Sequence, residues 1–464
     1  MQIPLLSGIT TSEMADFNIS YPINLEPVAA ENGISQGYVR SAMGAVPFAT
    51  GPGVDRGGIN WNGTLYRVMG TKLVSIAQNG AVATLGDVGA GGPVSMDYGF
   101  DRLAIQSGTS LYYWNGSILT QVTDPDLGQC LDVLWMDGYY ISTDGTYIIV
   151  TDLTDPTSID PLKYGSAEAD PDMVTGLLRL RDELYVFGSN TIQIFTDQGG
   201  TVFPFAVNDG ATIPIGCVGP RAKCLFSQTF AFCGAGRNHA PAIWQASGGT
   251  ALKLSTRAID DMLAEVADLS TVQLEARVSR DEERLYIHLP DRTLVYLQKA
   301  STIADKPVWY VCNSGQGMDK AYRPRNAVYV YGKWFVGDTE SNAVGVLDEG
   351  IATHFGEAVG WQIITPMLYN AAKSGIVHCL ELVGLPGRHK STTEPAAFFS
   401  YSLDGETWSM ERTNRLGRAG NRVKRITWNP HKRFRNYMAL KFRGDSSALA
   451  GWAALEADIE PLAA

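Results

Sequence analysis

The most regular pattern along the chain is a pair of short apolar strands whose starts lie eight residues apart, joined by a Gly-containing turn. The four clearest pairs are 65–68 with 73–76, 103–106 with 111–114, 139–142 with 147–150, and 184–187 with 192–195. A polar turn with Gly between two apolar runs is typical of a β-hairpin. One hairpin cannot bury both of its faces, so hairpins that recur every few tens of residues predict radial stacking in a β-propeller.

Later segments repeat the pattern with longer connections. They are 225–233 with 242–245, 284–289 with 293–297, and 327–331 with 334–337 and 343–347. The spacing fits four-stranded blades. About seven units can be counted, and six units plus a shared blade closed by the N-terminal arm fit nearly as well.

The periodicity changes at three places. Residues 1–50 contain Pro22, Pro27 and Pro47 and few alternating runs, which predicts an extended N-terminal arm. Residues 256–269 carry apolar side chains at helical spacing, which predicts an amphipathic helix inserted between blades, capped by Thr256. We expect this helix to cover a blade edge rather than to dock a partner.

From about residue 365 the strands are separated by polar, basic connections. The predicted strands are 376–382, 396–403, 423–428, 437–442 and 453–459, and they favour a small β-sandwich. We therefore expect an all-β chain with an arm at 1–50, a propeller of about seven blades at 51–364, and a C-terminal sandwich at 365–464.

The charge is distributed unevenly. The 464 residues carry a net charge of -11. Residues 388–443 hold 13 Lys and Arg against 4 Asp and Glu, whereas residues 1–387 hold 24 against 40. An acidic body with a basic segment near the C-terminus indicates contacts between copies, or with an acidic partner.

Cysteine usage and hydropathy narrow the class of protein. The six cysteines show no CxxC motif or metal-ligand spacing, which predicts free buried thiols, with a disulfide among Cys217, Cys224 and Cys233 as the alternative. The N-terminus lacks the pattern of a signal peptide, and no apolar stretch is long enough for a membrane span. We expect a protein made in the cytoplasm, with no membrane contact.

Catalytic constellations are weak. Ser402-Leu403-Asp404-Gly405-Glu406-Thr407-Trp408 is similar to the Asp-box hairpin of sialidases but is one residue short, and we interpret it as a turn device. Glycosidases need two carboxylates at a set separation, and no pair stands out among Asp144, Asp152, Asp155, Asp170, Asp172 and Asp182, which lie in turn contexts. The histidines His239, His288, His354, His378, His389 and His431 are scattered without metal-ligand spacing. We expect no catalytic residue, no metal and no cofactor.

The strongest candidate contact site is a basic cluster interleaved with aromatic residues. It comprises Arg412, Arg415, Arg418, Arg422, Lys424, Arg425, Lys432, Arg433 and Arg435. Such a cluster fits an acidic protein surface or a DNA backbone, and a solvated rim of the sandwich is the alternative. We favour protein contact, because the acidic body supplies a complementary surface. Reversal of Arg422, Lys424 and Arg425 to Glu is then expected to abolish assembly and leave the monomer folded.

A series of short segments, in order along the chain, resembles the packaged-DNA stabilisation protein, or tail hub, of short-tailed bacteriophages of the Salmonella lambdoid podovirus type. The segments are Gly37-Tyr38 with Arg40-Ser41, Tyr66-Arg67-Val68 with Gly70 and Lys72-Leu73, Val94-Ser95-Met96, Thr151-Asp152-Leu153, Phe187-Gly188-Ser189 with Thr191-Ile192, Ile287-His288-Leu289-Pro290 with Leu294-Val295-Tyr296, Thr365-Pro366, and 433–442. Each segment is weak alone, and their collinearity is specific. The likeness is clearest from about 60 to 300 and loosest between 384 and 430.

The resemblance implies a structural virion protein rather than an enzyme. It implies a hexameric ring in the tail that contacts the portal adaptor protein, the tail needle and the tailspike or tail fibre, and that retains the end of the packaged DNA in the head. Two alternatives from other classes are a carbohydrate-binding or carbohydrate-cleaving propeller, and a propeller scaffold of the host cell.

Overall fold

The four hairpins predicted from the sequence are the two middle strands of four successive four-stranded sheets. Leu65 pairs with Ile76 and Leu103 with Trp114, and the other two hairpins pair in the same antiparallel way. A middle strand packs on both faces against neighbouring sheets, so it reads as an apolar run. The outermost strands are half exposed and carry no comparable signal.

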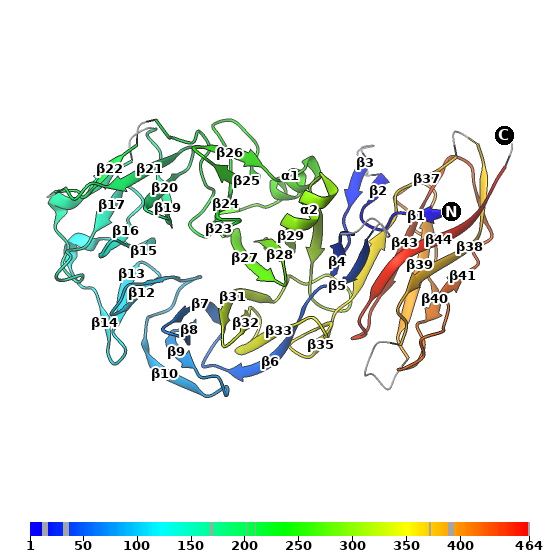
Figure 1. Cartoon of the computed structure of the whole chain (residues 1–464), viewed down its shortest axis with the longest axis horizontal. Coiled ribbons are helices and arrows are strands. Elements are labelled where there is room, and N and C mark those ends of the chain that lie inside the picture. Colours follow the sequence, from blue (N-terminus) through cyan, green and yellow to red (C-terminus); the bar gives the residue numbers. More distant parts are fainter. Residues whose placement is uncertain are drawn as a thin grey trace.

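In the computed structural model, six four-stranded sheets and one six-stranded sheet form a ring, and a two-layered sandwich lies at one end of the long axis (Figure 1). The structure describes residues 1–11, 17–30, 37–167, 170–200, 202–208, 210–370, 373–387 and 394–462. The all-β fold, a propeller followed by a sandwich, is the one that the sequence predicts. The division at residue 365 stays a prediction.

The first six blades each run from an inner strand outwards. Blade one contains β7 (Asp55–Trp61), β8 (Thr64–Met69), β9 (Lys72–Ile76) and β10 (Val82–Asp87). Blade two contains β11 (Ser95–Tyr98), β12 (Leu103–Ser107), β13 (Ser110–Trp114) and β14 (Leu119–Gln121). Blade three contains β15 (Asp132–Met136), β16 (Tyr139–Thr143), β17 (Tyr147–Val150) and β18 (Gly165–Ser166). Blades four to six contain β19 (Val174–Leu180), β20 (Glu183–Gly188), β21 (Ile192–Asp197), β22 (Phe205–Val207); β23 (Lys223–Phe226), β24 (Thr229–Gly234), β25 (Ala242–Ser247), β26 (Thr250–Lys253); β27 (Gln273–Ser279), β28 (Glu282–His288), β29 (Thr293–Leu297) and β30 (Trp309–Cys312).

Blade seven is closed by the N-terminal part of the chain. Its strands are β31 (Pro324–Val330), β32 (Lys333–Asp338), β33 (Ala343–Asp348), β6 (Gly44–Thr50), β34 (Thr353–His354) and β35 (Glu357–Ala358). β6 pairs antiparallel with β33, so the ring is joined by a strand from its own start. The closure that the sequence assigned to a shared blade therefore occurs in the seventh blade.

The sandwich also takes strands from the N-terminal arm. One sheet contains β1 (Gln2–Ile3), β4 (Leu25–Val28), β5 (Tyr38–Ser41), β38 (Gly375–Gly384), β41 (Thr427–Trp428), β42 (Lys432–Phe434) and β44 (Gly451–Pro461). The other contains β36 (Trp361–Ile364), β37 (Leu368–Tyr369), β39 (Ala396–Ser402), β40 (Arg412–Arg415) and β43 (Tyr437–Gly444). The hairpin of β2 (Gly8–Thr11) and β3 (Phe17–Ser20) forms a separate two-stranded sheet.

One strand prediction in the sandwich is wrong over most of its length. Of the predicted strand at 423–428, only Thr427 and Trp428 pair with β38. The residues before them are irregular, and the Val423 side chain is 91% exposed. Alternating apolar and charged residues gave a strand pattern there, although no neighbouring strand pairs with that stretch in the described structure.

The predicted helix is present and shorter than expected. α1 (Arg257–Ala264) buries Ile259 and Leu263 in the core of the fifth and sixth blades. Thr256 stands at the N-cap, but its side chain bonds to the Tyr21 hydroxyl at 2.7 Å instead of capping the helix. A second helix, α2 (Gln298–Ala304), was not predicted. α1 therefore packs on the blades, as the sequence indicates.

A buried ion-pair network joins the sandwich to the propeller. Glu26 on β4 accepts hydrogen bonds from Arg284 on β28, with Nη2 at 2.8 Å and Nε at 3.2 Å. Arg40 on β5 donates to the same carboxylate at 3.1 Å and, with its other terminal nitrogen, to Glu349 beyond β33. Glu26 is 3% exposed and Arg284 is 1% exposed. A buried charge is costly unless it is paired, and separation of the domains would leave these charges without partners. The network therefore fixes the two domains to each other.

Candidate functional site

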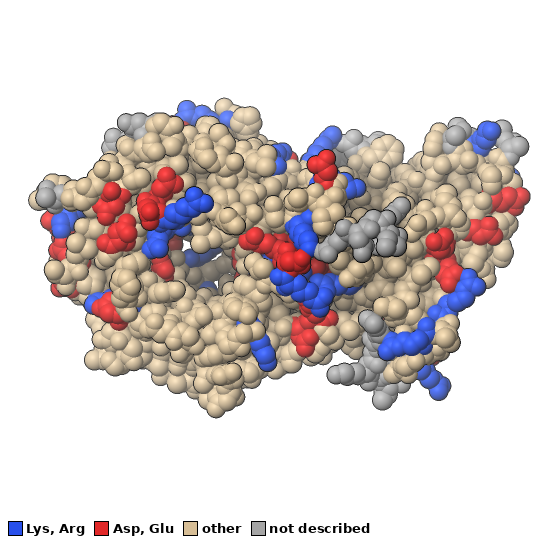
Figure 2. Space-filling model, viewed as in Figure 1, with Lys and Arg blue, Asp and Glu red and all other residues tan. Residues whose placement is uncertain are grey.

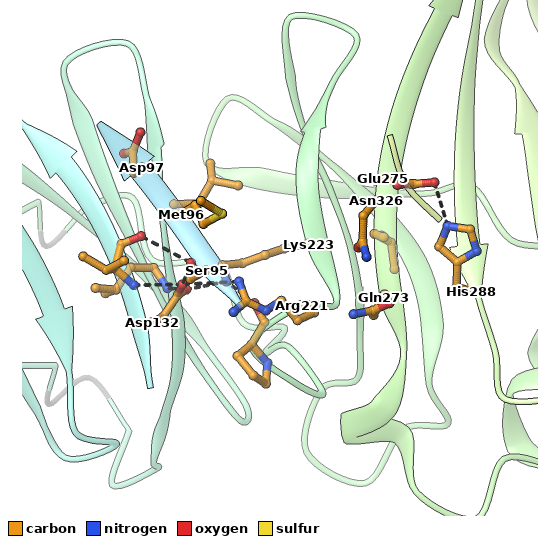
Figure 3. A pocket seen from close by; sticks show the side chains of 15 residues that line it. Ser95, Met96, Asp97, Asp132, Arg221, Lys223, Gln273, Glu275, His288 and Asn326 are labelled. Carbon is orange, nitrogen blue, oxygen red and sulfur yellow. Dashed lines mark hydrogen bonds and ion pairs between the residues drawn. The ribbon is translucent and has the colours of Figure 1, made fainter. Parts of the chain in front are cut away.

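A polar cavity of about 280 Å³ lies among the inner strands of the propeller (Figure 3). It is lined from β11, β15, β19, β23, β27, β28 and β31 and from the loop before β23. Ring-shaped folds often bind ligands at such a place. The contacts of its charged groups show how they are used.

Asp132 ties four blades together in this cavity. Its carboxylate accepts the Ser95 hydroxyl at 2.5 Å, the Leu177 N–H at 2.9 Å and the Lys223 ammonium at 2.8 Å. Burial alone would raise the pKa of Asp132, but Lys223 and Arg221 outweigh it and lower that pKa. Glycine at position 176 leaves space for the contact between Lys223 and Asp132, because a Cβ atom there would collide with the Lys223 ammonium.

Glu275 plays the same part between blades six and seven. It accepts the Ala327 N–H at 2.8 Å, lies 2.9 Å from His288 Nε2, and pairs with Arg277. Burial would raise the pKa of Glu275, but Arg277 and His288 outweigh it and hold that pKa well below its ordinary value. Burial also lowers the pKa of His288 to about 4. The cavity-lining carboxylates therefore bond the inner strands of neighbouring blades.

Blade one is held in a similar way. Asp55 accepts two hydrogen bonds from Arg67, at 2.7 and 2.8 Å, and one from Asn326 of blade seven at 2.7 Å. Arg56 donates to the carbonyl oxygens of Gly70, Gly89 and Gly92 and to Ser107 of blade two. The carboxylates Asp55, Asp132 and Glu275 and the guanidinium of Arg56, which join neighbouring blades, were not singled out from the sequence. A charged residue inside an apolar strand, as at Arg67, is the signal that could have found them.

The turn carboxylates considered from the sequence bond to turns or pair with a basic side chain. Asp144 accepts the N–H groups of Thr146 and Tyr147, and Asp172 accepts that of Asn190. Asp152 pairs with Lys163, Asp170 with Arg237, and Asp155 accepts the Thr157 N–H. Asp182 is exposed in the turn between β19 and β20. They are spread over different turns, and these contacts select no acid–base pair.

The Asp-box-like segment is a turn device, as expected. Asp404 accepts the Glu406 and Thr407 N–H groups at 3.0 and 2.8 Å and the Ser402 hydroxyl at 2.8 Å. These hydrogen bonds, led by the one from the Thr407 hydroxyl, lower the pKa of Asp404 well below its ordinary value. Trp408 lies under the Lys441 ammonium, 4.3 Å from its ring centre.

The histidines do not converge. His288 and His354 are buried in different blades, and His378 lies near His431 and 2.8 Å from Glu460. His389 lies outside the described residues. In the part of the chain that the structure describes, no group of three or more His, Cys, Asp or Glu could hold a metal ion. All six cysteines are free thiols.

Burial of His354 makes stability depend on pH. Burial, then Arg323 and Arg277, lower its pKa to about 3, against a smaller effect of Asp338, while Ser314 bonds its Nδ1 at 2.8 Å. Below pH 6.5 the His354 imidazole is protonated in the unfolded chain, whereas in the folded chain it stays neutral until the pH approaches about 3. Stability present above pH 6.5 is therefore lost as the pH falls, by about 2 kcal/mol at pH 5 from this group. Denaturant unfolding at pH 7 and pH 5 checks this, and His354→Asn should reduce the difference.

The basic cluster lies along one edge of the sandwich, where the two sheets meet; we call it the basic edge (Figure 2). It comprises β40, the loop 416–426, β41 and β42. Trp428 Nε1 donates to the Arg412 carbonyl oxygen at 3.0 Å, and Asn414 donates to that of Thr427 at 2.7 Å. These bonds join β40 to β41, and eight of the nine predicted basic residues lie on the elements of the basic edge, with Arg435 directly after β42.

The nine basic residues are not equivalent. Arg425 makes a bidentate pair with Glu381, and Glu394 lies 3.2 Å from Lys424 and 3.7 Å from Arg415. Arg412 and Arg422 donate to main-chain carbonyl oxygens, Arg433 donates to Ser374, and Lys432 lies over the Tyr401 ring. Arg418 and Arg435 are exposed, with no side-chain partner among the described residues. The charge of the basic edge thus comes from a subset that sequence alone could not distinguish.

No helix in the described ranges is long and apolar enough to cross a membrane.

Two family models match the chain in order. Residues 1–352 match the model described as Bacteriophage P22 Gp10, beta-propeller, and residues 360–460 match Bacteriophage P22 Gp10, beta-sandwich. The chain is 27% identical to the tail hub protein gp10 of Salmonella phage P22 over 466 residues, which is 95% of this chain and 96% of that protein. The boundary between the matched ranges falls between β33 of the last blade and β36 of the sandwich, whereas β1, β4 and β5 of the first range join the sandwich.

Solved structures give a more distant likeness. The N-terminal domain of Nup159 is 10% identical with a TM-score of 0.43, covering 70% of this chain and 98% of that one. PorZ of Porphyromonas gingivalis is 11% identical with a TM-score of 0.41, covering 80% and 46%. These values are too low to bear on function.

Proposed function

Since the chain belongs to the Bacteriophage P22 Gp10 family, with the propeller and the sandwich of that family in order, we propose that it is the tail hub of a short-tailed phage. In this role it forms a ring, expected to be a hexamer, below the portal adaptor. The ring carries the tail needle and the tailspikes or fibres and keeps the packaged DNA in the head.

The construction of the propeller supports a mechanical role. Asp55, Asp132 and Glu275 each bond inner strands of different blades, and Glu26 bonds the sandwich to blade six. Buried pairs of this kind make separation of their partners costly, because one partner would be left as an unpaired buried charge. A body held in this way suits a component that must keep its shape under the pressure of packaged DNA.

One combination of features carries the proposal: both domains of the family are present, and the two ends of the molecule carry charges of opposite sign. The basic edge lies on the sandwich, and acidic side chains gather over blades three and four at the other end (Figure 2). Complementary surfaces on one chain favour assembly of copies. In this proposal the role is structural and no reaction is catalysed.

A phage in which the gene for this chain is inactivated tests the role. Heads should still fill but then lose their DNA, and purified particles should lack needle and spikes. The measurements are the fraction of DNA-filled heads by electron microscopy and the protein content of the particles. Supply of the wild-type chain from a plasmid should restore both. Stable, DNA-filled and infectious particles without the chain would contradict the proposal.

A further inference from the structure

A surface of blades two to four carries apolar side chains that face solvent. Phe100, at the turn between β11 and β12, is 91% exposed, and Ile118, Leu153 and Leu162 are exposed in the connections β13–β14 and β17–β18. Because neighbouring strands are antiparallel, the first and third turns of a blade lie at the same end of it. We call this end of the three blades the distal patch.

Contacts between blades show that the distal patch is continuous. The Phe100 ring meets Trp135 of β15 edge-on, with ring centres 5.4 Å apart. Arg179 of β19 lies over the same indole at 5.5 Å and donates to the Trp135 carbonyl oxygen at 3.1 Å. A Cβ at Gly138 would touch Leu153, so the third turn of blade three packs on its first. Phe100 is thus presented on an ordered support rather than on a free loop.

The distal patch is acidic. Its strand ends and turns carry nine acidic residues, Asp97, Asp101, Asp137, Asp152, Asp155, Asp160, Asp182, Glu183 and Asp197, against four basic ones, Arg102, Lys163, Arg179 and Arg181. Asp137 and Asp182 are exposed and have no ion-pair partner in the described part of the chain. An apolar centre with a charged surround is the usual anatomy of a protein–protein interface.

The basic edge has the matching composition. Met410 and Val423 are each 91% exposed and lie among its arginines. Arg418, Arg422 and Arg435 are exposed and form no ion pair with the residues that the structure describes. Exposed apolar side chains within the basic run fit a protein surface better than a phosphate backbone, which is bound mainly by charge.

The two surfaces lie at opposite ends of the long axis, with the sandwich at the right and blades two to four at the left (Figure 1). We propose that the basic edge of one copy docks on the distal patch of the next copy, which rests on the ring assembly proposed above. A contact between two different surfaces of the same chain is head-to-tail, and it generates a ring when the rotation between copies closes.

Two variants with one damaged surface each test the contact. The edge variant is Arg418→Glu, Arg422→Glu and Val423→Ser; it leaves out Lys424 and Arg425, which are already paired with Glu394 and Glu381 within the sandwich. The patch variant is Phe100→Ser, Asp182→Lys and Asp137→Asn, since Asn tolerates the φ of 50° at position 137. Lys333→Glu, an exposed charge reversal in blade seven, is the control.

The masses of the species in solution are measured over a range of concentrations by mass photometry and sedimentation, with thermal unfolding to verify folding. Wild type and control should form rings, and each variant alone should be monomeric, with association weakened about 100-fold or more. An equimolar mixture should stop at dimers, because the intact edge of one variant meets the intact patch of the other. If the wild type forms rings, then rings from either variant alone, or a mixture that stays monomeric, would overturn the proposed contact. The proposed function would still stand in that case. A wild type that never associates would contradict the ring itself. If the edge variant forms intact rings but no longer shifts a DNA duplex in a gel-shift assay that the wild type shifts, the edge is assigned to DNA.

Discussion

Replacement of Asp132 by alanine should lower the free energy of unfolding of the propeller by about 3–5 kcal/mol. The carboxylate is 3% exposed and joins Ser95, Leu177 and Lys223, which lie on three other blades. Its loss leaves the ammonium of Lys223 buried without a counter-charge. Urea unfolding followed by tryptophan fluorescence measures the change.

Two controls separate the charge from the cavity that the substitution creates. The double variant Asp132→Ala, Lys223→Met removes the unpaired ammonium, so it should be more stable than the single variant. Asp137→Asn, an exposed change in the same blade, should shift stability by less than about 0.5 kcal/mol. A single variant as stable as wild type would show that Asp132 does not hold the blades together.

Substitution of Glu26 by glutamine should cost about 3–5 kcal/mol and separate the unfolding of the two domains. Glutamine keeps the shape, but the Arg284 guanidinium then lies in the interior without a counter-charge, and Arg40 keeps only Glu349. Calorimetry should resolve two transitions in the variant where the wild type shows a coupled one. The expected order is that the sandwich, released from blade six, unfolds first.

The matched control for this network is Glu349→Gln. Glu349 pairs with Arg40 and Arg280, but its side chain is more exposed than that of Glu26. The effect of a solvent-screened pair should stay below about 1 kcal/mol. Equal effects at the two positions would contradict the role given to burial at Glu26.

The sequence allowed the propeller to be predicted because its middle strands are buried on both faces. Leu103–Ser107 and Glu183–Gly188 read as apolar runs with turns at fixed spacing, and local pattern was enough. The strands of the N-terminal arm were missed, since β4 and β5 pair with each other and β5 with β44 near the C-terminus. Pairing across such a distance in sequence leaves no local periodicity.

The candidate contact site was predicted only in part, because partners that are distant in sequence leave no local pattern. Clustering in sequence identified the nine basic residues, but not that Glu381 and Glu394 neutralise three of them. The distal patch escaped notice because Phe100 and Leu162 belong to turns of different blades. Neighbourhoods of this kind arise from the stacking of blades and are visible only in the fold.

The central claim, that the chain is a tail hub, is tested most directly by electron microscopy of the virion that contains it. The account predicts a ring at the tail vertex, between adaptor and needle, into which copies of the seven-bladed propeller and its sandwich fit head-to-tail. Density for this fold at a capsid position or a fibre tip, or absent from the particle, would contradict it.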